Sequence, residues 1–124
     1  MPTILVIDDS RLSRTMVSDA LLEGGFNVVQ ARNGQEGLDK HAECNPDCII
    51  ADLLMPVMTG QEFIRVLRAK DSAVPVLVLT SDIQETSEAE CRAIGISRFL
   101  HKPVKADQIV NDVHELMTLK EVLQ

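Results

Sequence analysis

The stretch TILVIDDSRLSRTMVSDALLEGG, residues 3–25, decides the fold. It opens with a continuous apolar run at 3–7, rich in β-branched residues, which predicts a strand covered on both faces in a parallel sheet. An acidic turn, Asp8-Asp9-Ser10, ends the run. From Arg11 to the pair Gly24-Gly25 the apolar residues follow helical spacing, and the expected helix face carries Leu12, Met16, Val17, Ala20 and Leu21. The stretch therefore predicts a strand, an acidic turn and a helix.

The same strand-and-helix unit recurs along the rest of the chain. Apolar runs predict further strands at 26–31, 47–51, 76–79 and 99–100. Helical spacing predicts a helix at 35–43 and another helix after Gly60, with Phe63, Val66 and Leu67 facing inward. A further predicted helix spans about ten residues and ends near Gly95. The C-terminal segment is also predicted to be a helix, whose inward residues are Ile109, Val113, Leu116 and Met117. Strict alternation with right-handed crossovers predicts an α/β fold, in which five helices cover both faces of an open, five-stranded parallel sheet.

Length, composition and charge exclude several classes of protein. The 124 residues, 45% of them apolar, suffice for one domain with a real core, and we interpret 1–124 as a single domain without an output domain. A formal net charge of -7 argues against nucleic acid as a partner. No apolar run approaches the roughly 20 residues that span a bilayer, so membrane insertion is not expected. The three cysteines and the absence of an apolar leader favour the cytoplasm.

Several residues that could carry chemistry receive structural interpretations. Pro46 interrupts the segment that holds Cys44 and Cys48, so these are expected to be ordinary thiols, and Cys91 is expected to be a small apolar contact. The three histidines lie on different predicted elements without a second ligand at metal spacing, and are expected to be solvated: His41, His101 and His114. Leu119, Val122 and Leu123 of the last helical turn could contact a partner, but packing on the protein's own sheet is the favoured interpretation.

Charged and polar residues follow four of the five predicted strands: Asp8 and Asp9, Asp52, Thr80, and Lys102. Because the carboxyl ends of parallel strands meet at one edge, we expect these side chains in one crevice. Two carboxylates about 5 Å apart repel by roughly 3 kcal/mol at an effective dielectric constant near 20, so three of them require a cation. Oxygen ligands without a nearby His or Cys favour Mg2+. The sequence therefore predicts a magnesium site at this edge.

Asp52 is the best candidate for the reacting group. A carboxylate that attacks phosphorus forms an acyl phosphate, and such a nucleophile should stand between metal ligands and a cation. Asp52, on the middle predicted strand, meets this requirement. Thr80 could donate its hydroxyl to one phosphoryl oxygen and Lys102 could pair with another.

In this order, and over the whole chain, these residues resemble the receiver domain of bacterial two-component response regulators. The resemblance rests on Asp8-Asp9, Asp52 followed by Leu53-Leu54-Met55-Pro56, Thr80, Phe99 and Lys102-Pro103. It implies a flavodoxin-like strand order, 2-1-3-4-5. It also implies that Asp9 and Asp52 bind Mg2+ directly, with Asp8 acting through water and Leu54 through its carbonyl. The Lys102-Pro103 bond is expected to be cis.

The resemblance further implies a signalling switch rather than an enzyme, with at most slow autodephosphorylation. A histidine kinase or phosphotransfer protein would phosphorylate Asp52; the Thr80 hydroxyl would then move toward the phosphoryl group and the Phe99 ring would turn inward. The face formed by the fourth helix, fifth strand and fifth helix would change for a downstream effector, with the protein a monomer or a phosphorylation-dependent dimer. Phe99 replaces a common Tyr, Ser81 a usual Ala or Gly, and Thr59 a common acid, while Leu54 and Asp82 occupy variable positions that modulate attack by water.

Two other functions on the same fold have weaker support. A flavin or nucleotide carrier would need a Gly-rich or Ser/Thr-rich phosphate loop after the first strand, and this sequence has none there. It also has no Trp or Tyr to stack on a flavin. A phosphohydrolase with an aspartyl intermediate would need a second Asp two residues after Asp52, where this chain has Leu54.

Overall fold

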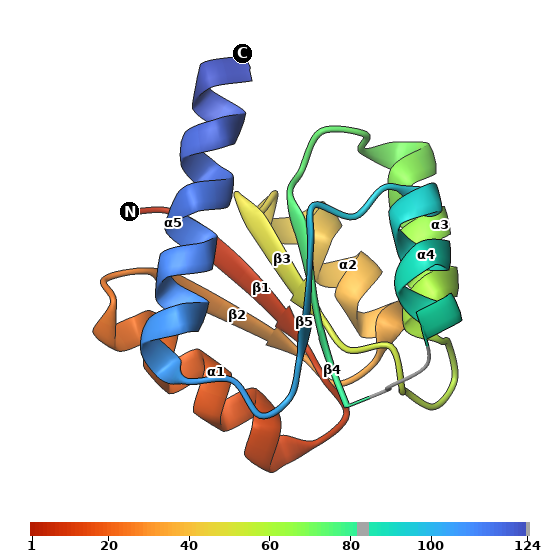
Figure 1. Ribbon diagram of the computed structural model, residues 1–124, viewed down its shortest axis with the longest axis horizontal. Coiled ribbons are helices and arrows are strands. Elements are labelled where there is room, and N and C mark those ends of the chain that lie inside the picture. The colour runs from red at the N-terminus through yellow and green to blue at the C-terminus, as the bar shows by residue number, and fades with distance from the viewer. Residues whose placement is uncertain (82–84, 124) are drawn as a thin grey trace.

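The computed structural model describes residues 1–81 and 85–123, without the side chains of residues 85, 86 and 120–123. Strands and helices alternate along the chain (Figure 1). The strands are β1 (Thr3–Ile7), β2 (Asn27–Ala31), β3 (Cys48–Ala51), β4 (Val76–Thr80) and β5 (Arg98–His101). The helices are α1 (Arg11–Glu23), α2 (Gly34–Cys44), α3 (Gly60–Lys70), α4 (Glu85–Ile94) and α5 (Ala106–Leu123).

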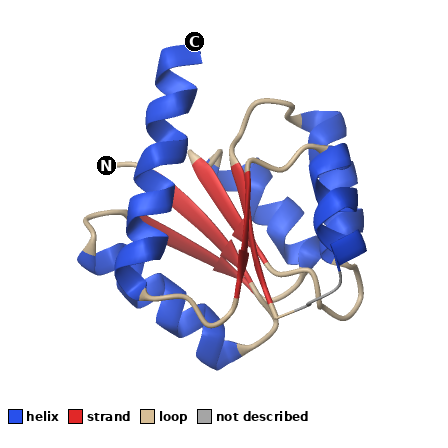
Figure 2. Ribbon diagram, viewed as in Figure 1, coloured by secondary structure: helices blue, strands red, loops and turns tan. Residues whose placement is uncertain are grey.

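The five strands form one parallel sheet in the order β2-β1-β3-β4-β5. Figure 2 shows this sheet between two layers of helices. Helices α1 and α5 cover one face, and α2, α3 and α4 cover the other (Figure 1). The α/β fold, the strand order and the placement of helices on both faces are therefore as predicted. No helix in the described ranges is long and apolar enough to cross a membrane.

Two apolar clusters, one on each face of the sheet, form the core. Along β1, Ile4 and Val6 point to the side of α1 and α5, while Leu5 and Ile7 point to the side of α2, α3 and α4. All four side chains are at most 1% exposed. Because successive side chains of a strand point to opposite faces, a sheet covered on both sides requires apolar residues at every position. This explains the unbroken apolar run with which the chain begins.

Three apolar residues that were assigned to helix faces inside the core are exposed. Leu12 and Met16 of α1 are 73% and 62% exposed, because at about 100° per residue they lie roughly 180° and 140° around the helix from the fully buried Leu21. Val66 of α3 is 37% exposed, whereas Ile64 is fully buried with Phe63. With about 100° per residue, position 66 lies roughly 110° from the centre of the buried face of α3. The predicted faces were wrong at these positions.

The thiols behave as predicted, but one histidine does not. Cys48 and Cys91 are fully buried among apolar side chains. His41, which was expected to be solvated, has a side chain only 12% exposed, with its Nε2 atom 3.0 Å from the Asp71 carboxylate. Burial alone would raise the pKa of Asp71, but hydrogen bonds from His41 and from backbone amides lower it. His41 therefore links α2 to the turn after α3.

The C-terminal part of α5 extends past the end of the sheet (Figure 1). Leu119 is 51% exposed, so the prediction that it packs on the sheet was wrong. The side chains of Val122 and Leu123 lie outside the described part of the chain. Earlier in α5, Ile109, Val113 and Leu116 are buried as predicted, and the partly buried Met117 packs against them.

Candidate functional site

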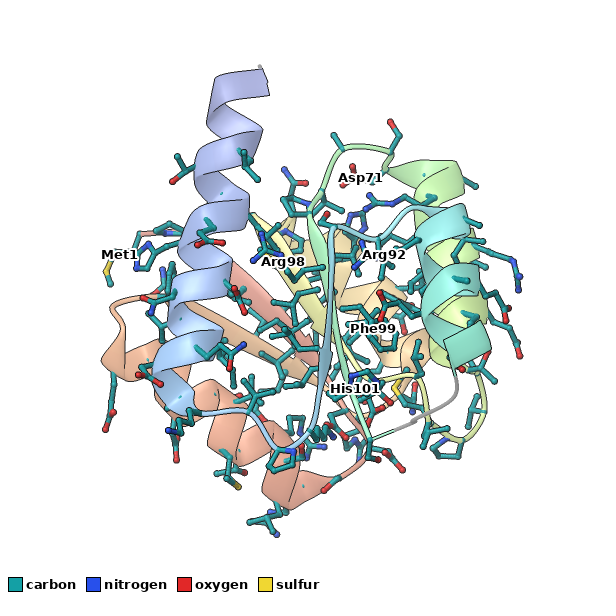
Figure 3. All side chains as sticks on the ribbon, in the orientation of Figure 1. Met1, Asp71, Arg92, Arg98, Phe99 and His101 are labelled. Atoms are coloured by element: carbon teal, nitrogen blue, oxygen red, sulfur yellow. The ribbon has the colours of Figure 1, made fainter. Side chains whose placement is uncertain are left out.

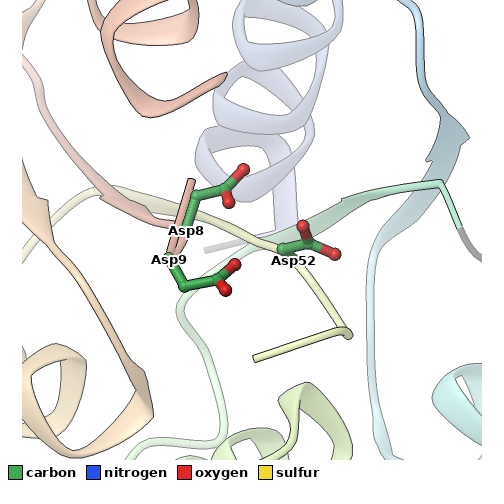
Figure 4. Close-up of side chains that lie close together, drawn as sticks. All are labelled: Asp8, Asp9 and Asp52. Atoms are coloured by element: carbon green, nitrogen blue, oxygen red, sulfur yellow. The ribbon is translucent and has the colours of Figure 1, made fainter. Parts of the chain in front are cut away.

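Three aspartates converge where β1 and β3 end. The two strands are neighbours, and Ile7 pairs with Ala51, so the residues that follow each strand lie side by side. One carboxylate oxygen from each of Asp8, Asp9 and Asp52 lies within 4.8 Å of the others, and Figure 4 shows the three side chains close together. Asp8 and Asp52 are 4% and 5% exposed, whereas Asp9 is exposed. The structure thus gathers the acidic residues that the sequence analysis selected.

Backbone amides orient the two buried carboxylates. The Ser10 amide donates a 2.9 Å hydrogen bond to Asp8 Oδ1, and the Leu54 amide donates a 3.1 Å bond to Asp52 Oδ1. The second oxygen of each carboxylate accepts from the Lys102 ammonium, at 2.8 Å for Asp8 and 3.0 Å for Asp52. Both buried carboxylates are thereby held in fixed orientations.

Lys102 reaches this site from the end of β5. Its backbone amide donates a 2.8 Å hydrogen bond to the carbonyl of Thr80, which extends the pairing of β4 with β5. Burial alone would lower the pKa of the ammonium, but its hydrogen bonds to Asp8 and Asp52, and their charges, outweigh burial and raise it. Lys102 therefore stays protonated at neutral pH. The Lys102–Pro103 peptide bond is cis, in agreement with what the resemblance implies.

The cluster has the chemistry of a site for a hard divalent cation. Its donors are carboxylate oxygens, which Mg2+ prefers, and an octahedral ion that keeps several waters needs only a few protein ligands. Three carboxylates and one ammonium leave a formal charge of about -2, which a divalent ion would neutralise. The Asp9 carboxylate makes no hydrogen bond within the described ranges, so it is available to a ligand. The donor set therefore fits Mg2+.

Thr80 and Phe99 lie on the neighbouring strands β4 and β5. Thr80 is the fully buried last residue of β4. The Phe99 ring is 8% exposed and belongs to the core cluster on the side of α2, α3 and α4. The ring of His101 meets it edge-on, with centroids 5.2 Å apart (Figure 3). The ring that the resemblance expects to turn inward is thus already inward here.

The loop between β3 and α3 contains features that the sequence analysis missed. Thr59, noted only as a replacement for an acid, caps α3 by accepting a 3.1 Å hydrogen bond from the Glu62 amide. Gly60 donates its amide to the Leu53 carbonyl at 3.1 Å, which folds the loop back on itself. Of the variable positions, Leu54 is 54% exposed, and Asp82 lies outside the described residues.

Val57 holds a conformation that suits its side chain poorly. Its φ is 73°, and a 2.8 Å bond from the Met58 amide to the Pro56 carbonyl closes a γ-turn around it. Left-handed backbone costs an L-residue about 1–2 kcal/mol, whereas Asn tolerates it. We expect Val57→Asn to raise the free energy of unfolding by about 1 kcal/mol in urea titrations. Val57→Ile keeps the branched side chain and should give no gain; equal stabilities for both variants would contradict the strain.

The chain is similar to known proteins over most of its length. Residues 4–114 match the family model described as the response regulator receiver domain. The chemotaxis protein CheY of Listeria monocytogenes is 32% identical over 111 residues, which cover 89% of this chain and 93% of that protein. The crystallised chemotaxis protein CheY4 of Vibrio cholerae has 34% identity and a TM-score of 0.89, covering 94% of this chain and 98% of that one.

Relatives also include proteins that are much longer than this chain. The hybrid signal transduction histidine kinase D of Dictyostelium discoideum is 32% identical over 125 residues, which cover 99% of this chain but 8% of the kinase. The same domain therefore occurs both in short chemotaxis proteins and within large ones. Because the family model spans most of the sequence and the fold agrees with it, the chain belongs to the response regulator receiver domain family, whose members are phosphoryl-accepting signalling switches.

Proposed function

We propose that Asp52 accepts a phosphoryl group from a phosphorylated histidine of a sensor kinase or phosphotransfer protein. The observation that supports this most strongly is the contact of the Lys102 ammonium with both Asp8 and Asp52, directly beside the acidic trio. A nucleophile between a cation and a set of metal ligands is the arrangement that phosphoryl transfer requires. The chain would act as a single receiver domain in the cytoplasm, where its three cysteines would stay reduced.

In the proposed transfer, one oxygen of Asp52 forms a bond to phosphorus as the bond from phosphorus to the imidazole nitrogen breaks. The electron pair of that bond stays on the nitrogen, and the histidine is regenerated. The Leu54 amide, 3.1 Å from Asp52 Oδ1, orients the attacking carboxylate. The Lys102 ammonium, which here donates to Asp52 Oδ2, would move to a phosphoryl oxygen. The Thr80 hydroxyl would donate to another phosphoryl oxygen. None of these residues needs to act as a base, because the attacking group is already anionic.

The acidic trio would hold Mg2+ through Asp8, Asp9 and Asp52, together with the backbone carbonyl of Leu54. When bound, the ion would supply positive charge to phosphoryl oxygens in the transition state. Asp9 contributes the most accessible of the three carboxylates, and Asp52 would contribute only the oxygen that does not attack. These assignments make phosphorylation strictly dependent on a divalent cation.

A groove beside the site is suited to the phosphodonor. It has a volume of about 240 Å³ and runs from Lys102 and Pro103 to the exposed Leu12 and Met16 of α1. A donor histidine must come within bonding distance of Asp52, so the protein surface around that histidine must cover the adjoining groove. Because the walls of the groove are mainly apolar, we propose that an apolar surface of the donor packs there.

We propose that the output surface is formed by α4, β5 and α5. Arg98 of β5 donates to Asp112 at 2.8 Å and to Glu115 at 2.9 Å, so β5 and α5 are expected to move together. Rearrangement around Thr80 and Phe99 would alter this surface for an effector, with the protein a monomer or a phosphorylation-dependent dimer. Leu54 offers no polar side chain to orient water near Asp52, which favours slow autodephosphorylation.

The proposed function predicts a metal-dependent acyl phosphate. Incubation with phosphoramidate, which carries the P–N bond of phosphohistidine, should add one phosphoryl group in the presence of Mg2+, measured by intact mass. The adduct should not form in EDTA, and hydroxylamine should remove it, because hydroxylamine cleaves acyl phosphates but not phosphoserine or phosphothreonine. An unmodified mass in Mg2+, or an adduct that resists hydroxylamine, would contradict the proposal.

A further inference from the structure

Arg14 lies one turn into α1 and bridges the ends of two strands. Its Nη1 atom donates a 2.7 Å hydrogen bond to the backbone carbonyl of Asp8, at the end of β1. Its Nε atom donates a 3.0 Å hydrogen bond to Oε1 of Gln30 in β2. Two directed bonds from one planar guanidinium fix its position, since the group cannot rotate without breaking one of them. The side chain therefore clamps the carbonyl of Asp8.

This clamp matters because the Asp9 carboxylate has no hydrogen-bond donor among the described residues. Asp8 and Asp52 each accept hydrogen bonds from a backbone amide and from Lys102. The Asp9 carboxylate accepts none within the described ranges, yet it converges with the other two to within 4.8 Å. The place from which this carboxylate reaches the others, its Cα and Cβ atoms, is set by the backbone that carries it.

The backbone sets that place through one peptide unit. The Asp8 carbonyl and the Asp9 amide belong to the same planar group, so fixing the carbonyl also fixes the line to the Asp9 Cα atom. The other side of Asp8 is held by its amide, which donates to the Ala31 carbonyl at 3.1 Å. Together the sheet and Arg14 leave the turn little freedom.

We infer that Arg14 is a positioning residue: by holding the Asp8 carbonyl, it fixes the peptide plane that aims the Asp9 carboxylate at the proposed cation site. This inference rests on the proposed function, because the cation is what Asp9 would meet. Groups that orient metal ligands without touching the metal typically change metal affinity by about tenfold or more when they are removed.

The Mg2+ affinity of Arg14→Lys separates positioning from simple electrostatics. A positive charge near the site repels a divalent cation, so a role of Arg14 through charge alone predicts unchanged affinity in Arg14→Lys, which keeps the charge. A role in overall stability alone predicts easier unfolding without a change in affinity. Positioning predicts weaker binding in Arg14→Lys, because a lysine cannot make both directed bonds.

The experiment uses the whole chain and 15N-labelled protein titrated with MgCl2, followed through the amide shifts of Asp9 and Asp52. We expect the Kd for Mg2+ to rise by about tenfold in Arg14→Lys. Gln30→Ala, which removes only the second support of the guanidinium, should raise it by less. Arg11→Lys is the matched control, since exposed Arg11 precedes the clamp by one turn and makes neither contact, and it should bind as the wild type does.

A second measurement, in metal-free protein, tests the clamp without the ion. The backbone order parameter of Asp9 should fall from the rigid value of about 0.85 in Arg14→Lys and stay there in Arg11→Lys. Wild-type Mg2+ affinity and an unchanged Asp9 order parameter in Arg14→Lys would overturn the inference. A wild-type protein that binds no Mg2+ would instead refute the proposed metal site, while the order parameter would still decide whether Arg14 holds Asp9.

Discussion

Replacing Asp52 with asparagine is expected to abolish phosphorylation by phosphoramidate and Mg2+. Loss of a nucleophile typically lowers a reaction rate by at least about a thousandfold, because the remaining groups stabilise a transition state that can no longer form. The change is otherwise small. The single side-chain oxygen of an asparagine can still accept from the Leu54 amide, but its amide nitrogen would replace the oxygen that now accepts from Lys102 and cannot accept that bond. Intact mass after incubation should therefore show only the unmodified chain.

The matched control is Asp19→Asn, an exposed position on α1 that also removes one negative charge. It should acquire one phosphoryl group at the wild-type rate, which separates the loss of a nucleophile from the loss of charge. Circular dichroism should show that both variants are folded. An Asp52→Asn protein that still gains a hydroxylamine-labile phosphoryl group would place the acceptor elsewhere.

Substituting Gly60 with alanine is expected to destabilise the fold and displace the acceptor together. A Cβ atom at this position would lie 2.5 Å from the Asp52 carbonyl oxygen and 2.6 Å from the Leu53 Cα atom, both of them backbone atoms that cannot swing aside. Overpacking of this kind costs about 3 kcal/mol, so the urea midpoint should fall clearly. Because the strain falls on the residue that carries the reacting carboxylate, the folded fraction should also be phosphorylated more slowly.

Gly34→Ala provides the comparison for this substitution. A Cβ atom there would approach Met58, with 2.9 Å to the sulfur, but a thioether side chain can turn away. We expect a loss of less than about 1 kcal/mol and an unchanged phosphorylation rate. Equal stability losses at the two glycines would show that the contact with the Asp52 backbone is not the cause.

Much of the site could be predicted because parallel strands place their carboxyl ends together. Asp8, Asp9, Asp52 and Lys102 each follow an apolar run, so their convergence follows from the fold alone. The order of the strands came from the family resemblance, since alternation does not determine which strands are neighbours. The cap at Thr59 could have been found from the Thr-x-x-Glu spacing that ends at Glu62.

Other features could not be predicted, because they depend on how the helices, strands and turns pack in three dimensions. Helical spacing groups Leu12 and Met16 with the buried Ala20, but does not reveal which side of α1 meets the sheet. The contact of His41 with Asp71 joins positions 30 residues apart, and no local pattern marks it. The hydrogen bond from Arg14 to the Asp8 carbonyl depends on the path of the backbone after β1, which residue types do not define.

The contact between Asp8 and Lys102 joins positions 94 residues apart. During translation, the acidic trio therefore leaves the ribosome long before its counter-charge does. Until β5 emerges and pairs with β4, a nascent chain carries the acceptor without the ammonium beside it. Under the proposed function, a nascent chain would not draw phosphoryl groups from its donor until β5 has been made and has paired with β4.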